Sequence, residues 1–303
     1  MPEAIPKFSV VIPHLNQPEL LIRCLRSLRE GARQPDEITV VDNGSREMPD
    51  KICGAFEGVR LLQELTPGPG PARNRGIAAS TGDILAFIDA DCLADRDWLA
   101  KAEAAMRDPG SDILGGDVRI AYADPSRLTM LEAYESIYAY RMDRYIAREG
   151  FTGTGNLVVR RKVLEAVGPF AGLSVAEDRD WGQRATAMGY RIRYVPDMKV
   201  YHPARIHFSE MAAKWDRHTA HDYMAAEDRP AGRLRFAGKT LVMILSPLGE
   251  IPRILFSDRV SGLRNRWLAF LGVVRTRFYR SRIMLKLCLG GNPAHLSGSW
   301  NRK

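Results

Sequence analysis

The amino-acid sequence predicts an α/β fold, with a mostly parallel sheet, helices on both faces of the sheet and a helical extension at the C-terminal end. Three observations lead to this prediction. Short apolar runs alternate with segments of helical spacing in the first third of the chain, such runs end in turn-forming or polar residues, and arginines alternate with apolar residues in the last quarter. With 45% hydrophobic and 26% charged residues, the 303-residue chain has the composition of an ordinary folded protein.

The predicted strands are β-prone apolar runs that a proline, a turn or an acidic residue ends. They cover residues 8–13, 37–42, 59–62, 84–88 and 191–195, and residues 151–159 are expected to form a loop that leads into another strand. Because strands alternate with helices, right-handed βαβ units and a mostly parallel sheet are expected.

The predicted helices have apolar residues three and four positions apart. They cover residues 20–28, 72–79, 128–145 and 177–188, and helical spacing returns from residue 234 onward. The tyrosines Tyr134, Tyr138 and Tyr145 recur along one of these helices. This spacing favours packing in the core over a role in binding a ligand.

The positive charge of the chain lies in its last quarter. The formal net charge is +8, yet residues 230–303 hold 14 Lys and Arg and two acidic residues, so the rest holds 30 basic and 34 acidic residues. The basic segment suggests an anionic surface as partner, either lipid or nucleic acid. Its arginines flank Trp267, Phe270, Phe278 and Tyr279, a composition typical of an interfacial helix on anionic lipid.

Several classes of protein are disfavoured. The four cysteines form no CxxC pair, so a zinc site made of cysteines is not expected. We expect these cysteines to be reduced thiols of a cytoplasmic protein. We find no signal peptide and no apolar stretch of the roughly 18–20 residues that cross a bilayer. There is also no phosphate loop ending in Gly-Lys-Ser/Thr.

Polar side chains follow the ends of three predicted strands. They are Asn16, Asp42 and Asp89. Ligands bind beyond the carboxyl ends of the strands in parallel sheets, so these residues are site candidates. Asp89 and Asp91, with one residue between them after a buried strand, are placed to meet one hard divalent cation that would neutralise a diphosphate.

The order of motifs resembles that of the family-2 glycosyltransferases of the GT-A fold. The motifs are Pro13, residues 40–45, residues 72–76 and residues 83–91, and the resemblance extends over about residues 8–202. It implies a Rossmann-like, GT-A type nucleotide-binding sheet and sugar transfer with inversion. The expected GT-A domain is residues 1–228, with a nucleotide-sugar half of about 1–118 and an acceptor half of about 119–228, and residues 229–303 form the basic amphipathic extension.

The resemblance assigns the donor pocket to four residues. Asp42 is similar to the carboxylate that receives the nucleotide base, with Pro13 and Asn16 lining the same pocket, and Arg73 to the residue that reaches the base or the diphosphate. His14 stands where the family often has an aromatic residue. UDP is the nucleotide that the resemblance favours.

The resemblance also implies a divalent metal, Mn²⁺ or Mg²⁺. Asp91 is similar to the direct metal ligand, and Asp89 to the aspartate near the donor ribose and the metal. Some relatives supply a third ligand from a histidine at the position of His202, although a lone histidine is as often structural.

The catalytic base is expected in the acidic motif at residues 177–181. An inverting transfer needs one carboxylate to take the acceptor proton. Asp178 is the first choice and Asp180 the competitor, although acidic residues are also favoured at any helix N-terminus.

A loop over donor and acceptor is expected at Gly153, Thr154, Gly155 and Asn156, with Trp181 of the acidic motif beside it. Glycines there permit close approach of the backbone.

The sequence therefore predicts a metal-dependent hexosyltransferase-type enzyme acting on a nucleotide sugar and a glycan or lipid-linked acceptor, in exopolysaccharide or other surface-glycan assembly. We expect it in the cytoplasm, at the inner face of the cell membrane through its basic extension, and not on nucleic acid. The alternatives are a nucleotidyltransferase that makes nucleotide sugars and a non-enzymatic nucleic-acid-binding protein.

Overall fold

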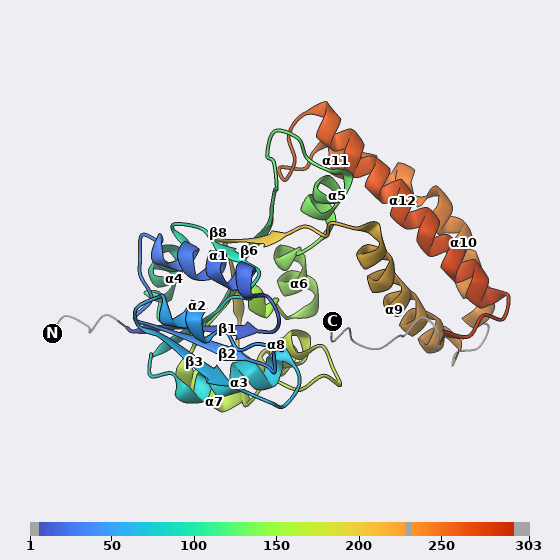
Figure 1. Cartoon of the computed structure of the whole chain (residues 1–303). Coiled ribbons are helices and arrows are strands. Elements are labelled where there is room, and N and C mark those ends of the chain that lie inside the picture. Colours follow the sequence, from blue (N-terminus) through green and yellow to red (C-terminus); the bar gives the residue numbers. More distant parts are fainter. Residues whose placement is uncertain (1–5, 228–231, 294–303) are drawn as a thin grey trace. The chain divides into compact units, whose positions relative to one another are not determined.

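The structure, a computed structural model, describes residues 6–227 and 232–293. It divides into two compact units, which we call the sheet unit and the helical unit (Figure 1). The sheet unit consists of the residues up to Ala121 together with Tyr140–Pro203, and the helical unit of Tyr122–Ala139 together with the residues from Ala204 onward. The expected domain boundary at residue 228 lies outside the described residues.

One eight-stranded sheet forms the centre of the sheet unit, with the strand order β3-β2-β1-β4-β7-β6-β8-β5. The strands are β1 Phe8–His14, β2 Glu37–Asp42, β3 Val59–Gln63, β4 Ile84–Phe87, β5 Leu93–Ala94, β6 Ile113–Ala121, β7 Leu157–Arg160 and β8 Ile192–Pro203. Four of the seven pairings are parallel, and β7 and β5 supply the antiparallel ones. The predicted α/β class with a Rossmann-like, mostly parallel sheet is confirmed, and β8 is longer than expected.

Helices cover both faces of the sheet because strand residues alternate between two cores. Val10 of β1 and Ala86 of β4 face a core shared with α1, α2 and α4, whereas Val11 and Phe87 face a core shared with α3, α7 and α8. Figure 1 shows these two layers of helices on opposite sides of the strands. The helices of this unit are α1 Pro18–Arg29, α2 Asp50–Gly54, α3 Pro69–Ala79, α4 Trp98–Met106, α6 Met142–Glu149, α7 Arg161–Val167 and α8 Glu177–Ala187.

The described residues of the helical unit form five helices with their own apolar core. They are α5 Met130–Tyr138, α9 Phe208–Glu227, α10 Gly232–Gly249, α11 Ile251–Leu255 and α12 Leu263–Cys288. Tyr134 of α5 packs against Gly272 of α12 so closely that a Cβ at Gly272 would lie 2.6 Å from the Cβ of Tyr134. The helical extension that the sequence predicts is present in the residues that the structure describes.

The single helix predicted over residues 128–145 is wrong. A capping box, in which Thr129 and Glu132 bond reciprocally, starts α5, but this helix ends at Tyr138. Tyr140 has a φ of +49°, the left-handed region that a helix does not continue through, and α6 begins anew at Met142. The break separates the tyrosines, because Tyr134 and Tyr138 stack on each other in the helical unit and Tyr145 stacks on Phe151 in the sheet unit.

Among the described residues, no helix combines the length and the apolar character that crossing a membrane requires.

Candidate active site

Asp91 and His202 are brought together by the pairing of β5 with β8. Leu93 of β5 lies opposite Tyr201 of β8, so the residues just before Leu93 and just after Tyr201 are neighbours. Nε2 of His202 lies 3.4 Å from Oδ2 of Asp91. The Sγ atom of Cys92 belongs to the same cluster, in which the three potential ligand atoms lie within 4.8 Å of one another.

The donor set of this cluster fits a divalent cation that accepts both oxygen and nitrogen. A carboxylate and an imidazole suit Mn²⁺, whereas Mg²⁺ prefers oxygen ligands alone. Burial and the charges of Asp91 and Asp89 raise the pKa of the Cys92 thiol well above its usual value. Burial also raises the pKa of Asp91, with Asp89 acting in the same direction and His202 against it.

His202 is held in place by Tyr140, which the sequence analysis did not identify. The two rings lie 4.5 Å apart between centroids, and the hydroxyl of Tyr140 is 3.1 Å from Nε2 of His202. Nδ1 of His202 lies 2.7 Å from the carbonyl oxygen of Pro203, which it reaches as a donor. No sequence signal joins Tyr140 to His202, because the contact depends on the left-handed backbone at Tyr140.

Arg73 connects the end of β4 to the start of α8. Its side chain is 3% exposed, and it donates from Nη2 to Asp89 over 2.7 Å and from Nη1 to Glu177 over 2.8 Å. Burial acts to lower the pKa of Arg73, but the two carboxylates outweigh it and raise that pKa. Glu177 is a second residue that the sequence analysis left without a role, although it precedes the predicted base.

The predicted loop at residues 153–156 lies between Asp89 and Asp178. It contains a 3₁₀ turn, Thr154–Asn156, in which Thr154 is buried. A Cβ at Gly155 would lie 2.7 Å from Oδ2 of Asp89, and a Cβ at Gly153 would lie 3.9 Å from Oδ2 of Asp178. The absence of a side chain at Gly155 therefore leaves space for the carboxylate of Asp89, whereas a Cβ at Gly153 would meet Cε of Met142 at 2.9 Å.

Asn156 supports this loop from the interior, and Trp181 anchors α8 to the residues that follow α7. Oδ1 of Asn156 accepts a hydrogen bond from Nε1 of Trp98 over 2.8 Å, and its Nδ2 donates to the carbonyl oxygens of Asp117 and Met198. Trp181 is buried and donates to the carbonyl oxygen of Gly168 over 3.0 Å.

The two candidate bases have different surroundings. Burial and the neighbouring charge of Glu177 raise the pKa of Asp178, whose Oδ1 accepts a hydrogen bond from the backbone N–H of Arg179. Asp180 instead forms an ion pair with Arg184, at 3.0 Å between Oδ2 and Nε. Asp178 is thus the carboxylate whose environment favours proton uptake.

Asp42 lies at the end of β2 in a buried hydrogen-bond network. Its carboxylate accepts from Nδ1 of His14 over 2.9 Å, from the hydroxyl and backbone N–H of Ser45 and from the backbone N–H of Gly44. Burial acts to raise the pKa of Asp42, but the bonds from Ser45 and His14 outweigh it and lower that pKa. His14 stands where the family often has an aromatic residue, and its Nε2 lies 3.2 Å from the backbone nitrogen of Gln17.

Pro13 and Asn16 flank this network. Asn16 has a φ of +53°, its backbone N–H donates to the hydroxyl of Ser45, and its Oδ1 accepts from the backbone N–H of Arg46. Pro13 is partly exposed beside it. The sheet unit thus holds two groups of candidate residues. The first comprises Arg73 with Asp89 and Glu177, and the neighbouring pair Asp91 and His202. The second surrounds Asp42.

Comparison with known proteins gives consistent matches. Residues 9–168 match the profile of the family described as Glycosyl transferase family 2. Glycosyltransferase AglE of Haloferax volcanii is 35% identical over 222 residues, which cover 71% of this chain and 72% of AglE. The pre-mycofactocin glycosyltransferase of Mycobacterium tuberculosis is 28% identical over 223 residues, or 68% of this chain and 44% of that protein.

Solved structures share the fold. The mannosyltransferase PcManGT of Pyrobaculum calidifontis, determined with GDP-Man and Mn²⁺, has a TM-score of 0.57 at 19% identity, covering 94% of this chain and 88% of its own. S. aureus TarS 1–349 with UDP-GlcNAc has a TM-score of 0.52 at 20% identity, covering 88% and 71%. The family match covers more than half of the chain and agrees with the GT-A sheet. This chain belongs to glycosyl transferase family 2.

Proposed function

We propose that this family-2 glycosyltransferase moves a sugar from a UDP-sugar to an acceptor hydroxyl, with inversion at the sugar carbon and with Asp178 as the base. Family membership supports sugar transfer. The observation that carries the assignment of roles is the buried Arg73, because its two ion pairs tie the Asp89–Asp91 segment to the helix that bears Asp178. The residues for the leaving diphosphate and for the attacking hydroxyl are therefore held by one side chain.

Asp178 would take the proton of the acceptor hydroxyl as the oxygen attacks the sugar. Its raised pKa makes it a stronger base than an ordinary aspartate, and efficient general bases have a pKa shifted toward the working pH. Asp180 is already paired with Arg184, so we assign it a structural role.

Asp91 and His202 would hold a divalent cation, for which Mn²⁺ is the better fit. When bound, such an ion neutralises the charge that builds on the leaving diphosphate. Tyr140 orients the imidazole of His202, and Arg73 holds the carboxylate of Asp89. In this proposal Asn156 positions the loop from the interior, Trp181 anchors α8 through its bond to Gly168, and neither touches substrate.

The nucleotide base would bind at the ends of β1 and β2, beside Pro13 and Asn16. Asp42 is fully buried and accepts hydrogen bonds from three residues. We therefore propose that Asp42 fixes the 14–16 and 44–46 loops, which in turn form the wall of the base pocket. TarS was solved with UDP-GlcNAc and PcManGT with GDP-Man, so both nucleotides need to be tested.

We propose a lipid-linked glycan as the acceptor and a hexose as the sugar, in surface-glycan assembly at the inner face of the cell membrane. The support is the concentration of basic residues in the segment 230–303. The nucleotidyltransferase and nucleic-acid-binding alternatives find no support in the family match.

The direct test is release of nucleoside diphosphate from UDP-, GDP- and dTDP-sugars with Mn²⁺ or Mg²⁺. We expect one donor to be turned over only with metal, and we expect both Asp91→Ala and Asp178→Asn to abolish turnover. Calorimetric titration separates the two roles, because Asp91→Ala should lose metal-dependent UDP binding while Asp178→Asn keeps it. Equal binding of UDP and metal by wild type and Asp91→Ala would remove Asp91 from the metal site.

A further inference from the structure

Helix α10 carries apolar residues on two opposite faces. Phe236 and Met243 pack toward α12 in the core of the helical unit. Leu241, Leu245 and Leu248, spaced four and three residues apart on the other face, are 69%, 70% and 63% exposed. A helix on the surface of a soluble protein normally turns a polar face outward, so the outer face of α10 needs an apolar environment.

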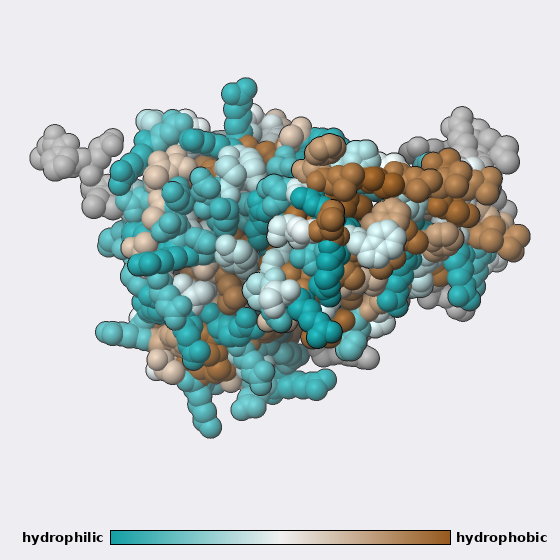
Figure 2. All heavy atoms as spheres, turned by 90° about the horizontal axis from the view of Figure 1, so that it is seen from above, coloured by the Kyte–Doolittle hydropathy of each residue, from teal (hydrophilic) through white to brown (hydrophobic). Residues whose placement is uncertain are grey.

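Helix α12 continues this exposed apolar surface. One stripe along the helix bears Leu263, Trp267, Phe278, Leu285 and Leu289, which are all exposed and are separated by four, eleven, seven and four residues. Figure 2 shows hydrophobic residues gathered in a broad brown area over the helical unit.

The joint between α10 and α12 is apolar as well. Leu255 ends α11, and the side chain of Phe256 that follows it is 88% exposed.

A row of exposed cations borders the apolar stripe of α12. Arg264, Arg275, Arg282 and Lys286 follow one another at intervals of eleven, seven and four residues, so they share a face that is turned slightly from the stripe. Unlike these exposed cations, Arg277 and Arg253 form ion pairs with Glu250 inside the unit. Within the row, the guanidinium of Arg275 stacks 4.0 Å from the ring centre of Phe208, and Arg264 donates to the carbonyl oxygen of Leu128. The exposed Arg282 and Lys286 are therefore the members of the row whose charge is directed outward.

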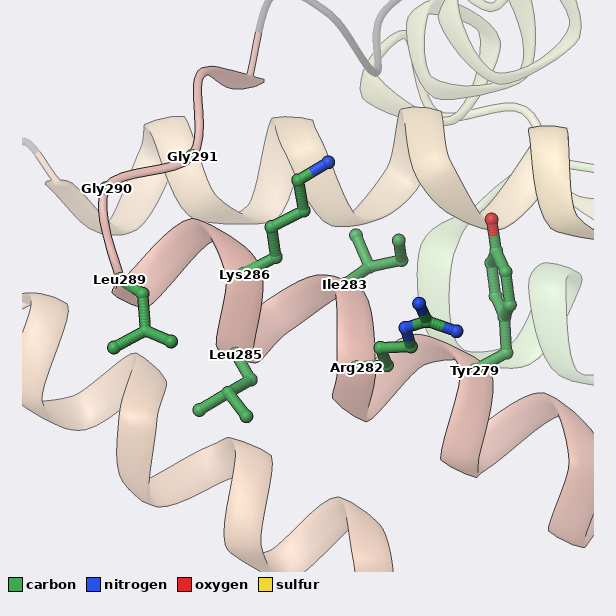
Figure 3. Close-up of a pocket in the computed structure, with 8 residues that line it drawn as sticks. All are labelled: Tyr279, Arg282, Ile283, Leu285, Lys286, Leu289, Gly290 and Gly291. Carbon is green, nitrogen blue, oxygen red and sulfur yellow. The ribbon is translucent and has the colours of Figure 1, made fainter.

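A surface pocket of about 600 Å³ lies at the end of α12, where the stripe and the row of cations meet. Figure 3 shows Leu285 and Leu289 pointing to one side of the helix and Lys286 to the other, with Arg282 between them. Cationic groups beside leucines match a lipid that has an anionic headgroup above acyl chains.

We propose that the exposed faces of α10 and α12, with the joint at Phe256, bind the surface of an anionic bilayer with the helices lying in the plane of the interface. We name this surface the docking face, and its exposed residues are Leu241, Leu245, Leu248, Phe256, Leu263, Trp267, Phe278, Leu285 and Leu289 with Arg282 and Lys286. The apolar run at residues 240–249 is about 15 Å long, half of the ~30 Å that a spanning segment needs, so the helices lie in the interface and do not cross it. A second copy of the chain is a poor occupant, because two identical rows of cations repel each other.

This inference extends the lipid-linked acceptor of the proposed function, yet it depends only on the helical unit. Its test is cosedimentation of the full chain with vesicles of phosphatidylcholine alone or mixed with phosphatidylglycerol. We expect binding to the mixed vesicles, weakened by added salt. Arg282→Gln with Lys286→Gln should lower the partition coefficient about 30-fold, from roughly 1 kcal/mol per cation.

A second variant addresses the apolar contribution. Leu241→Gln with Leu245→Gln should lower the partition coefficient by about tenfold or more, because each leucine loses its transfer out of water. Its matched control is Leu65→Gln with Ile206→Gln, two residues that are exposed elsewhere and should leave binding unchanged. Failure of all variants to reduce binding, or no binding to mixed vesicles, overturns the proposal.

Two further measurements keep the outcomes apart. Sedimentation equilibrium without lipid tests self-association: a dimer that the Leu241→Gln, Leu245→Gln variant converts to monomer would assign the face to a second copy and overturn the lipid assignment. Vesicle binding by Asp178→Asn should equal that of wild type, and the docking-face variants should still release nucleoside diphosphate. Loss of transfer with intact vesicle binding would count against the proposed function alone.

Discussion

Two aspartates two positions apart in α8 have opposite environments. Asp180 has a guanidinium partner that holds its charge, whereas Asp178 is partly buried beside Glu177. A carboxylate that must accept a proton gains from an environment that penalises its charge. The competition between these residues, which the sequence left open, is thus resolved in our proposal by their neighbours.

Replacement of Asp178 with Asn should separate activity from stability. We expect transfer to fall about 10²- to 10⁴-fold, the usual contribution of a general base. Because folding raises the pKa of Asp178, the folded protein binds this proton more tightly than the unfolded chain, and stability falls as the pH rises through the two pKa values. Asp178→Asn should therefore have a higher free energy of unfolding than wild type at pH 7, and this difference should vanish below the ordinary aspartate pKa; urea titration across pH measures it.

Asp180→Asn is the control for this variant. It removes a partly exposed ion pair of about 1 kcal/mol or less and should leave most of the turnover. If Asp180→Asn lost as much activity as Asp178→Asn, the assignment of the base would be wrong.

Among the elements, the loop at residues 153–156 carries the tightest constraint on the site. Gly155→Ala would place a Cβ 2.7 Å from Oδ2 of Asp89, whose other oxygen holds Arg73. We expect turnover to fall about 100-fold, because a displacement of about 1 Å near reacting groups has that effect. Gly172→Ala, with no atom within 4 Å of the added Cβ, is the matched control and should keep wild-type turnover in the same assay.

Much of the sheet unit was predictable from local patterns. The runs that become β1, β2 and β4 are almost continuously apolar, and their successive side chains face the two cores in turn. Continuous apolar runs of this length are typical of strands in a sheet that is covered on both faces. The break between α5 and α6 was not predictable, because the residues around Tyr140 keep helical spacing and only its left-handed backbone interrupts it.

The candidate site was predictable where its residues stand in motifs, and not where they meet by folding. Asp89, Asp91 and Asp178 follow local motifs, whereas Tyr140 meets His202 only because β8 and the 140 turn come together. The burial of Asp42 also needed the structure, because a carboxylate at a strand end is as often open to ligand as enclosed.

At the scale of the whole molecule, ligand binding should stabilise the sheet unit selectively. With Mn²⁺ present throughout, UDP at about 100 times its dissociation constant adds about 2.7 kcal/mol to a folded state that binds it. We expect Tm to rise by about 5 °C for the transition of this unit in scanning calorimetry. The same additions should leave Asp91→Ala unshifted, and a shift of equal size in that variant would contradict the metal site.

The two-residue strand β5 would give the proposed metal site a property of its own. It is the last strand of the sheet, held to β8 by the pairs Leu93–Tyr201 and Ala94–Val200, and the cluster of Asp91 and His202 lies directly beyond the first of these pairs. A cation bound by those two side chains would stabilise the pairing of β5 with β8. Without the cation, the few hydrogen bonds between these strands would open more often by local unfolding. Amide hydrogens along β5 and β8 would then exchange with deuterated water at a rate set by the occupancy of the ion. Exchange at this edge would report metal affinity without any sugar being transferred, in inactive variants as well as in the wild type.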